Sequence, residues 1–451
     1  MRKLNDYPIS VNIMNIKEMK IPFLQSLLLL TLLILTGGDP LTAGGTSSVQ
    51  PPAKGIDHVR VLWMENPSSE AVISWSTREE GKKHRVYYDT EPRGGEPDDY
   101  AKRQKTFRDG KFTTVDEDVS WTVPTYYHHV YLDKLKPATP YYLVIESDDA
   151  VSREFHFVTA PEKDEPLAIL HGGDSRIGAQ SGPSGGLDPY DHNDRQKMNL
   201  RMATLLEDHP GIIALAHGGD YCLRAELRFM DRWLTDFELT TTKEGRLLPI
   251  IPTRGNHDKG VGFEEIFAWP DLKTDYYYTT KLSEEIALIT LNTELSIGGD
   301  QRDWLEKNLD ALRRNNRWVF TQYHQPAYTS VKNPQRSASQ LTYWVPLFEK
   351  YNVDLVCESD DHALKRTLPI RNGAPDLENG IVYIGDGGLG VPQRTPDPSR
   401  WWLQKPGFAK SAHHVFMLQF NQKEMRGRAF GMDGEVLDDF RLTPKAVMVH
   451  D

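Results

Sequence analysis

Polar residues of types that bind metal ions follow five apolar runs, each at the point where we expect a strand to end. In chain order they are Asp174, Asp220, Asn256 with His257, His324, and Asp360 with His362. Ligands of open α/β sheets bind beyond the carboxyl ends of the strands, so we expect these side chains to meet. Carboxylate, amide and imidazole groups are the ligands that two closely spaced cations need, with one carboxylate bridging them.

Each of these signals is weak when it stands alone. A Gly-Asp pair after a strand is more often a turn, and Asn256 could equally be a turn residue. His324, which precedes Gln-Pro, could be an ordinary loop histidine. The occurrence of all five strand ends in one chain is what indicates a metal centre.

The stretch ESDDH, residues 358–362, raises an electrostatic question. Three carboxylates and an imidazole at the end of a buried strand repel one another unless positive charge lies among them. A pair of cations held by His362 and Asp360 would supply that charge. Glu358 and Asp361 would then pair with neighbouring basic residues, such as Arg176, Lys365 and Arg366.

Such a centre can hydrolyse a phosphate ester. Two metal ions lower the pKa of a bound water and neutralise the phosphoryl oxygens, so hydroxide attacks phosphorus directly. A neighbouring histidine can assist departure of the alcohol.

The elements that must position these residues come after an all-β region at residues 58–161. Six short runs there, alternating or rich in aromatic residues, are separated by Pro, Gly, Asn and Asp, which is typical of a β-sandwich. The segment KLKPATPYYLVI, residues 134–145, resembles the fibronectin type III signature. Sandwich domains of this kind usually bind or dimerise, so we expect no catalysis there.

After residue 161 strands alternate with helices, which predicts a layered α/β domain. We expect strands at LAILHGG, GIIALAHGG, LLPIIPTRG, EIALITLN, RWVFTQYH, VDLVCE and GIVYIGDGG. We expect helices near residues 193–208, 225–238, 301–315 and 337–351.

Length and composition limit the remaining possibilities. A chain of 451 residues that is 39% hydrophobic and 26% charged is typical of a globular protein with two domains. The net charge of −11 argues against nucleic acid as a partner. Cys222 and Cys357 could pair, but two buried free thiols are the favoured interpretation. The oligomeric state is not indicated.

Residues 1–45 are expected to be a signal peptide or an N-terminal anchor. Lys17 and Lys20 precede the apolar run IPFLQSLLLLTLLILT, and LTA at residues 41–43 offers small residues for cleavage. Membrane helices usually need ~20 apolar residues, so we favour export to a secreted or periplasmic location over a retained anchor. No stable membrane embedding is expected after cleavage.

The ordered motifs GGD, GGD, GNHD, YHQP and a final motif ending in His resemble the metallophosphoesterase (calcineurin-like phosphoesterase) superfamily. With the fibronectin-like region ahead of them, the sequence is most similar to purple acid phosphatases. The resemblance implies a β-sandwich at residues 55–161 and a four-layer α/β/β/α domain at residues 165–446. It also implies a phosphate ester substrate and two metal ions drawn from iron, manganese and zinc.

The resemblance assigns a role to each motif residue. The first metal would be held by Asp174, Asp220 and His362. Asp220 would bridge to a second metal held by Asn256, His324 and the residue at 360. His257 would face the substrate, where it would bind phosphate or protonate the leaving group.

Two positions depart from the family pattern. A tyrosine normally lies three residues after the second Asp, where this chain has Leu223, and Gly-His-x-His is replaced by Ser-Asp-Asp-His at residues 359–362. The ligand set keeps a formal charge of about −3 if Asp360 ligates, but negative charge moves to the second metal. This change favours harder ions such as manganese or ferrous iron. Tyr221 is an outside candidate for the missing phenolate, and a degraded second site is the alternative.

Other polar residues have two interpretations each. Arg176 could clamp a phosphate or form a salt bridge with Glu358 or Asp361. His192, Asn193 and Arg195 could line the pocket, although a helix N-cap at Asn193 is the plainer interpretation. Arg254 and Lys259 could contact the substrate or lie at the surface, and His413 or His414 could reach the site. Trp401 and Trp402 could cover the pocket or the domain interface.

The sequence therefore predicts an exported hydrolase of phosphate mono- or diesters. One rival is a non-catalytic extracellular binding protein with a vestigial metal site. Another is a phosphodiesterase or nucleotidase, which would differ only in its substrates.

Overall fold

The computed structural model describes residues 55–113, 124–163, 165–176, 189–270 and 275–445, with side chains in the first helix from residue 193 on. These residues belong to a compact unit that spans Pro51–Asp451. The predicted signal peptide or anchor, residues 1–45, lies outside the described residues. Within the described part, no helix is both long enough and apolar enough to cross a bilayer.

The N-terminal region is all-β, as its sequence predicts. Its strands are β1 (Asp57–Leu62), β2 (Ala71–Thr77), β3 (His84–Asp89), β4 (Lys102–Lys105), β5 (Arg108–Lys111), β6 (Tyr126–Leu132), β7 (Pro140–Ser147), β8 (Ala150–Val151) and β9 (Phe155–Val158). Strands β4, β3, β7 and β8 form one sheet, and β9 adds to β7. Strands β1, β2, β6 and β5 lie in a different sheet. Trp75, Val86 and Leu143 from the two sheets share one buried core, which is the arrangement of a sandwich.

The rest of the chain alternates between strands and helices. Its strands are β10 (Leu167–Gly172), β11 (Ile212–His217), β12 (Ile250–Pro252), β13 (Tyr278–Lys281), β14 (Ile286–Thr290), β15 (Trp318–Gln322), β16 (Leu355–Cys357), β17 (Leu364–Arg366), β18 (Ile370–Arg371), β19 (Ala374–Pro375), β20 (Val382–Gly385), β21 (Phe408–Lys410), β22 (Val415–Phe420), β23 (Met425–Phe430) and β24 (Val436–Leu442). Its α-helices are α1 (Pro189–Asp208), α2 (Leu227–Phe237), α3 (Val261–Ile266), α4 (Asp300–Asn315), α5 (Ala338–Tyr343) and α6 (Val345–Lys350). Short 3-10 turns occur at Pro97–Asp99, Glu238–Thr240, Pro334–Ser337 and Trp401–Leu403.

Two helix predictions need correction. The helix expected at residues 337–351 is divided at Trp344 into α5 and α6, because Pro346 has no N–H to continue the first helix and fits only in the first turn of a new one. Asn193 is not an N-cap, because α1 already begins at Pro189. The short helix α3 was not predicted.

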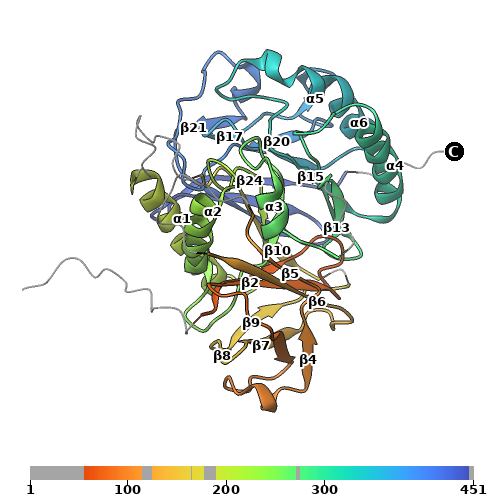
Figure 1. The fold of residues 1–451 in the computed structure, drawn as a ribbon. Coiled ribbons are helices and arrows are strands. Elements are labelled where there is room, and N and C mark those ends of the chain that lie inside the picture. Colours follow the sequence, from red (N-terminus) through yellow and green to blue (C-terminus); the bar gives the residue numbers. More distant parts are fainter. Residues whose placement is uncertain (1–54, 114–123, 164, 177–188, 271–274, 446–451) are drawn as a thin grey trace, which may run out of the picture. The chain divides into compact units, whose positions relative to one another are not determined.

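Two large sheets face each other in this second part. Alternate residues of the second sheet point to opposite sides: Leu288, Phe320 and Leu355 join the core shared with the first sheet, whereas Ile289, Val319 and Val356 join a separate core with α4 and α6. Helices α1 and α2 pack on the outside of the first sheet through Met202 and Trp233, among others. Figure 1 shows the resulting order of layers, with α1 and α2 on one side and α4 to α6 on the other. The predicted four-layer α/β/β/α arrangement is confirmed.

The first sheet extends beyond this second part. Its ten strands run in the order β24-β23-β22-β10-β11-β12-β1-β2-β6-β5, and β1 pairs with β12 in parallel, with Leu62 opposite Ile250. Strands of the β-sandwich and strands that carry the candidate site are therefore hydrogen-bonded in one sheet. The division into domains at residues 161 and 165 stays a prediction.

Candidate metal centre

The strand ends predicted to carry ligands meet at one place. Strands β10, β11 and β12 are parallel neighbours in the first sheet, and β15 and β16 are parallel neighbours in the second. The loops that follow them carry the predicted residues, which are Asp174, Asp220, Asn256, His257, His324, Asp360 and His362. Within each sheet the loops leave at the same edge because the strands are parallel. The loops of the two sheets meet there, since His324 after β15 lies 3.3 Å from Asp220 after β11.

Four of these residues have left-handed backbone conformations that side-chain-bearing residues rarely adopt. The φ angle is 55° at Asp174, 57° at Asp220, 75° at Asp360 and 60° at His362. Each such conformation costs of order 1–3 kcal/mol and persists only where the surroundings impose it. Gly387, with φ of 88°, packs so closely on Asp174 that a Cβ atom there would overlap the carboxylate. This concentration of strain is typical of a functional site.

The ligand atoms of the cluster are close enough to share cations. His362 Nε2 lies 3.1 Å from Asp174 Oδ1, and His324 Nε2 lies 3.3 Å from Asp220 Oδ1 and 3.6 Å from Asp360 Oδ1. Ligand atoms of Asp174, Asp220 and His324 all lie within 4.8 Å of one another. These three side chains are fully or almost fully buried.

The orientation of His324 tests whether the residues fit a metal ion. Its Nδ1 lies 2.9 Å from the carbonyl oxygen of Gly218, which can only accept, so Nδ1 carries the hydrogen. In the neutral ring, Nε2 then presents a lone pair to oxygens of Asn256, at 3.2 Å, Asp220 and Asp360. A lone pair facing three oxygens is the donor arrangement that surrounds a cation. The residues therefore fit a bound metal ion.

The close spacing of carboxylates and imidazoles shifts the pKa values of the candidate ligands. Burial by itself would raise the pKa of Asp174, but the His362 and His324 imidazoles lower it below its usual range. Burial would lower the pKa of His324, but the Asp220 and Asp360 carboxylates raise it well above its usual range. The carboxylates and the imidazoles of the cluster therefore shift each other's pKa values in opposite directions.

His257 lies beside the cluster and is more accessible than the ligands, with its side chain 28% exposed. Its Nδ1–H donates to the Leu223 carbonyl oxygen at 2.8 Å, which leaves Nε2 directed at the centre, 3.9 Å from Asp220 Oδ2. Burial, more than the neighbouring charges, lowers the pKa of the His257 ring. Nε2 is thus the His257 atom that can meet a substrate.

The last residue of the GNHD motif has a positioning role that sequence reasoning missed. The buried carboxylate of Asp258 accepts hydrogen bonds from the backbone N–H groups of Asp220, Tyr221 and Gly255, at 2.7, 3.0 and 2.8 Å. It thereby fixes the second and third ligand loops to each other. The GNHD motif was the sequence signal that could have pointed to Asp258.

Two basic side chains lie within the ligand set. Arg176 donates to His257 Nε2 at 2.9 Å and to His362 Nε2 at 3.1 Å, and its Nε lies 3.3 Å from Asp220. The expected salt bridge from Arg176 to Glu358 or Asp361 is therefore not the one formed.

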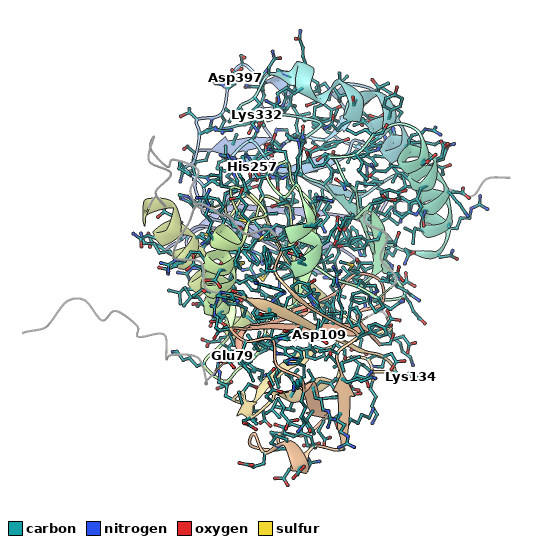
Figure 2. The ribbon with its side chains drawn as sticks, in the orientation of Figure 1. Glu79, Asp109, Lys134, His257, Lys332 and Asp397 are labelled. Carbon is teal, nitrogen blue, oxygen red and sulfur yellow. The ribbon has the colours of Figure 1, made fainter. Side chains whose placement is uncertain are left out.

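Lys332, which sequence reasoning missed, pairs through Nζ with Asp360. Figure 2 shows Lys332 between Asp397 and His257 in the α/β part of the molecule. No motif marks a lysine eight residues after a histidine, so the sequence held no signal for it.

Of the other carboxylates of ESDDH, Glu358 pairs with a basic residue, whereas Asp361 accepts from the backbone N–H groups of residues 330–332. Glu358 is bound by Lys365 at 2.7 Å and by the Tyr323 hydroxyl at 2.7 Å. Lys365 is fully buried and also lies 3.0 Å from Asp386. The expected partner Lys365 is confirmed for Glu358, whereas Arg366 pairs with Asp438 instead. These buried pairs hold the loop after β16 in place.

Several other predicted candidates contact different parts of the chain. Tyr221 stacks on His217 and packs in an aromatic core, so it does not replace the missing phenolate. His413 and His414 bind backbone carbonyls of Val391 and Ala412. The remaining candidates have local partners: Arg195 with Asp236 and Ser175, Arg254 with the Asp258 carbonyl, Lys259 with Glu294, and Trp402 with the Thr329 carbonyl. Trp401 packs on Trp402, Asn193 is exposed, and the side chain of His192 lies outside the described residues.

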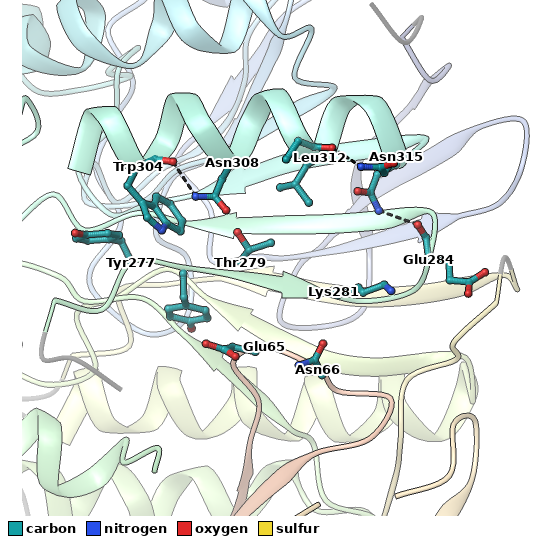
Figure 3. Close-up of a pocket in the computed structure, with 13 residues that line it drawn as sticks. Glu65, Asn66, Tyr277, Thr279, Lys281, Glu284, Trp304, Asn308, Leu312 and Asn315 are labelled. Atoms are coloured by element: carbon teal, nitrogen blue, oxygen red, sulfur yellow. Dashed lines mark hydrogen bonds between the residues drawn. The ribbon is translucent and has the colours of Figure 1, made fainter. Parts of the chain in front are cut away.

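Two other features of the described residues fit a metal centre less well. His84, Asp109 and His128 lie close together in the sandwich, but both ring nitrogens of each histidine already have hydrogen-bond partners. A cavity of about 640 Å³ lies between α4 and β13 (Figure 3). It is lined by Trp304, Asn308, Thr279 and Lys281, and none of the candidate ligands borders it.

Family comparisons agree with the geometry. Residues 192–364 match the calcineurin-like phosphoesterase model, and this range includes every candidate ligand from Asp220 to His362. Residues 56–159 match the model of the purple acid phosphatase N-terminal domain. The chain belongs to the metallophosphoesterase superfamily. The resemblance drawn from the sequence is thereby confirmed.

Individual relatives are distant from this chain. An uncharacterised protein of Mycobacterium tuberculosis is 26% identical over 378 residues, which cover 77% of this chain and 65% of that protein. The chain thus spans slightly less than two thirds of that relative's length. An Arabidopsis thaliana protein named Fe(3+)-Zn(2+) purple acid phosphatase 12 is 23% identical, with 75% and 73% coverage. The structure of the purple acid phosphatase PPD1 from yellow lupin has the same fold, with a TM-score of 0.70, 18% identity and coverage of 87% and 75%.

Proposed function

We propose that this chain is an exported phosphoric ester hydrolase that uses two metal ions and acts on phosphate monoesters, with phosphate diesters as the second substrate class to test. The observation that carries the proposal is the buried cluster of Asp174, Asp220 and His324 at the carboxyl ends of the strands. Asp220 and His324 lie in the residues that match the calcineurin-like phosphoesterase model, which supports ester hydrolysis over other metal-dependent chemistry.

Two groups of residues would hold the ions. The first ion would be held by Asp174, Asp220 and His362, and the second by Asp220, Asn256, His324 and Asp360. When bound, the ions would lower the pKa of a water and neutralise the phosphoryl oxygens. The carboxylate at Asp360 favours a harder ion at the second position, such as manganese or ferrous iron.

The remaining residues position the substrate. When the His257 ring is protonated, its Nε2–H can donate to a phosphoryl oxygen or to the departing alcohol, while the Leu223 carbonyl holds the ring orientation. The guanidinium of Arg176 reaches His257, His362 and Asp220, so it is placed to bind two phosphoryl oxygens at once. Export rests on the apolar run and small residues within residues 1–45.

Turnover of 4-nitrophenyl phosphate and bis(4-nitrophenyl) phosphate, with manganese, iron or zinc added to chelator-stripped protein, tests the proposal. We expect metal-dependent hydrolysis of the monoester, and loss of activity by at least about 100-fold in Asp220→Asn. Absence of both activity and bound metal would favour the rival, a non-catalytic binding protein.

The metal content of the protein distinguishes a site that holds two ions from a site that holds one. We expect about two equivalents in the wild-type protein and about one in Asp360→Ala, by elemental analysis. Asp397→Ala, which removes a carboxylate from a facing loop, is the matched control and should keep both ions. Equal metal content in Asp360→Ala and the wild type would show that Asp360 is not a ligand.

A further inference from the structure

Each half of the ligand set contains a basic side chain of the protein itself. Arg176 contacts Asp220 and His362, which are ligands of the proposed first ion. Lys332 pairs with Asp360, a ligand of the proposed second ion. The guanidinium and the ammonium group therefore lie next to the atoms that the two metal ions need.

Lys332 is held in this position by its backbone. The carboxylate of Asp361 accepts hydrogen bonds from the N–H groups of Ser330, Val331 and Lys332, the last two at 2.8 and 3.2 Å. The Lys332 carbonyl oxygen accepts from the Thr329 hydroxyl at 2.9 Å and from Arg400 at 3.0 Å. The side chain is only 18% exposed. The two adjacent aspartates thus have different roles, because Asp361 fixes the loop and Asp360 receives its ammonium group.

Arg176 is fixed in a similar way. It follows Asp174 by two residues, and the intervening Ser175 is held by three groups: its hydroxyl contacts His217 and Trp233 at 2.9 Å, and its carbonyl oxygen accepts from buried Arg195. Arg176 itself is 7% exposed. A guanidinium so confined cannot move far unless another charge replaces it at the carboxylates.

The formal charges nearly balance without any ion. Asp174, Asp220 and Asp360 contribute −3, and Arg176 and Lys332 contribute +2. Two divalent ions would add about +4, so a site that also kept both basic groups would be strongly positive while buried, which is costly. The electrostatics favour one set of cations or the other next to the carboxylates.

We propose that Arg176 and Lys332 are internal counter-cations, which neutralise the centre in the metal-free protein and are displaced from its carboxylates when metal ions bind. The inference rests on the proposed function in taking Asp220 and Asp360 as metal ligands. Displacement leaves both basic groups at the rim of the centre, free to contact a phosphate. It also means that the metal-free protein keeps its fold, at the cost of weaker metal binding.

Lys332→Met tests the proposal through metal affinity and stability, without reference to activity. Titration of Mn²⁺ into chelator-stripped protein by calorimetry should give a Kd at least about tenfold lower than in the wild type, because a competing unit charge is gone. The metal-free variant should unfold at a lower temperature, because Asp360 is left buried without its partner. Manganese should therefore raise its Tm by more than it raises that of the wild type.

Four further variants make the result specific. Lys332→Gln can still donate to Asp360 without a charge, so it should fold and show the same tighter binding. Lys332→Arg retains the charge and should behave as the wild type. Lys259→Met is the matched control, because that lysine is 70% exposed and lies 3.7 Å from Glu294 rather than at a ligand. Arg176→Met should shift the affinity in the same direction as Lys332→Met.

The outcomes separate this inference from the proposed function. Unchanged or weaker Mn²⁺ binding in Lys332→Met and Lys332→Gln would overturn the counter-cation role and leave the hydrolase proposal standing. If only the variants bound Mn²⁺ and the wild type did not, the counter-cations would be confirmed and metal-dependent hydrolysis by the native chain would be rejected. If no variant bound Mn²⁺, both proposals would fall.

Discussion

At the scale of single residues, the centre depends on histidines whose backbone hydrogen bonds direct the other ring nitrogen at the centre. His257 and His324 both commit Nδ1–H to a backbone carbonyl, so that Nε2 faces the centre. The two histidines differ in what surrounds Nε2. His324 meets carboxylate and amide oxygens, as a ligand does, whereas His257 meets the guanidinium of Arg176 and is partly exposed.

This difference predicts the effect of replacing His257 with Gln. We expect kcat to fall by about 10²–10⁴ for phenyl phosphate and by less for 4-nitrophenyl phosphate, whose leaving group needs less help from an acid. Metal content should stay unchanged, as elemental analysis can show. His413→Gln, which changes a histidine that binds Val391, is the control. Equal losses with both substrates would argue against a proton donor.

At the scale of elements, loops rather than strands complete the site. The ten-stranded and seven-stranded sheets bring five strand ends together, but the segment after β15 supplies Lys332 only because Asp361 holds it. The facing segment contributes to the same support, since the Asp397 N–H donates to the Ser330 carbonyl oxygen at 2.8 Å.

Asp361→Ala should loosen this segment without unfolding the sheets. Three backbone N–H groups lose their acceptor, so we expect the amides of residues 330–332 to lose protection in hydrogen exchange. The free energy of unfolding should fall by about 2–3 kcal/mol. Asp397→Ala is the matched control, because its carboxylate contacts Ser399 and Arg400 and none of these three amides. Unaltered exchange in Asp361→Ala would contradict the assignment.

At the scale of the whole described unit, charged pairs join the β-sandwich strands to the helices of the α/β part. Arg78 pairs with Asp57 at 3.1 Å and with Asp231 of α2 at 2.6 Å. The His58 N–H donates to Glu238 at 2.5 Å, immediately after α2. Burial raises the pKa of Glu238 from 4.5 to about 7. Its protonation in the folded protein therefore couples this junction to pH.

The sign of the pH effect follows from that raised pKa. Glu238 contributes stability in its protonated form, which is fully present below about pH 4.5 and is lost as pH rises through about 7. Glu238→Gln cannot ionise, and its amide oxygen can still accept from His58. The Tm of this variant relative to the wild type should therefore rise by about 2–4 °C between pH 5 and pH 8. Glu244→Gln, at an exposed position, should show no such change. Parallel pH profiles for Glu238→Gln and the wild type would refute the coupling.

The sequence by itself determined the apolar strands, most of the helices and the identity of the candidate ligands. It missed strands with a less apolar sequence, such as β13, β17, β21 and β24. Alternating apolar residues define buried strands, and polar residues at Asp174, Asp220, His324 and His362 stand out because they end those strands. The break between α5 and α6 was missed, because the pattern alone suggested one helix, although the proline at 346 cannot continue a helix. Such features are local, because they depend on the types of residues that are neighbours in the sequence.

Only the tertiary structure decided what balances the charge at ESDDH. The sequence predicted metal ions, and the structure places Lys332, Arg176 and Lys365 among the carboxylates. Lys365 lies seven residues after Glu358 and was predicted as its partner, and Arg176 was predicted to pair with other carboxylates. Lys332 comes from the segment after β15, and nothing near it in the chain distinguishes it from a surface lysine. Its role depends on which loops the two sheets bring face to face. Charge pairing over such distances in the sequence is a property of the fold, because the Coulomb energy depends on separation in space.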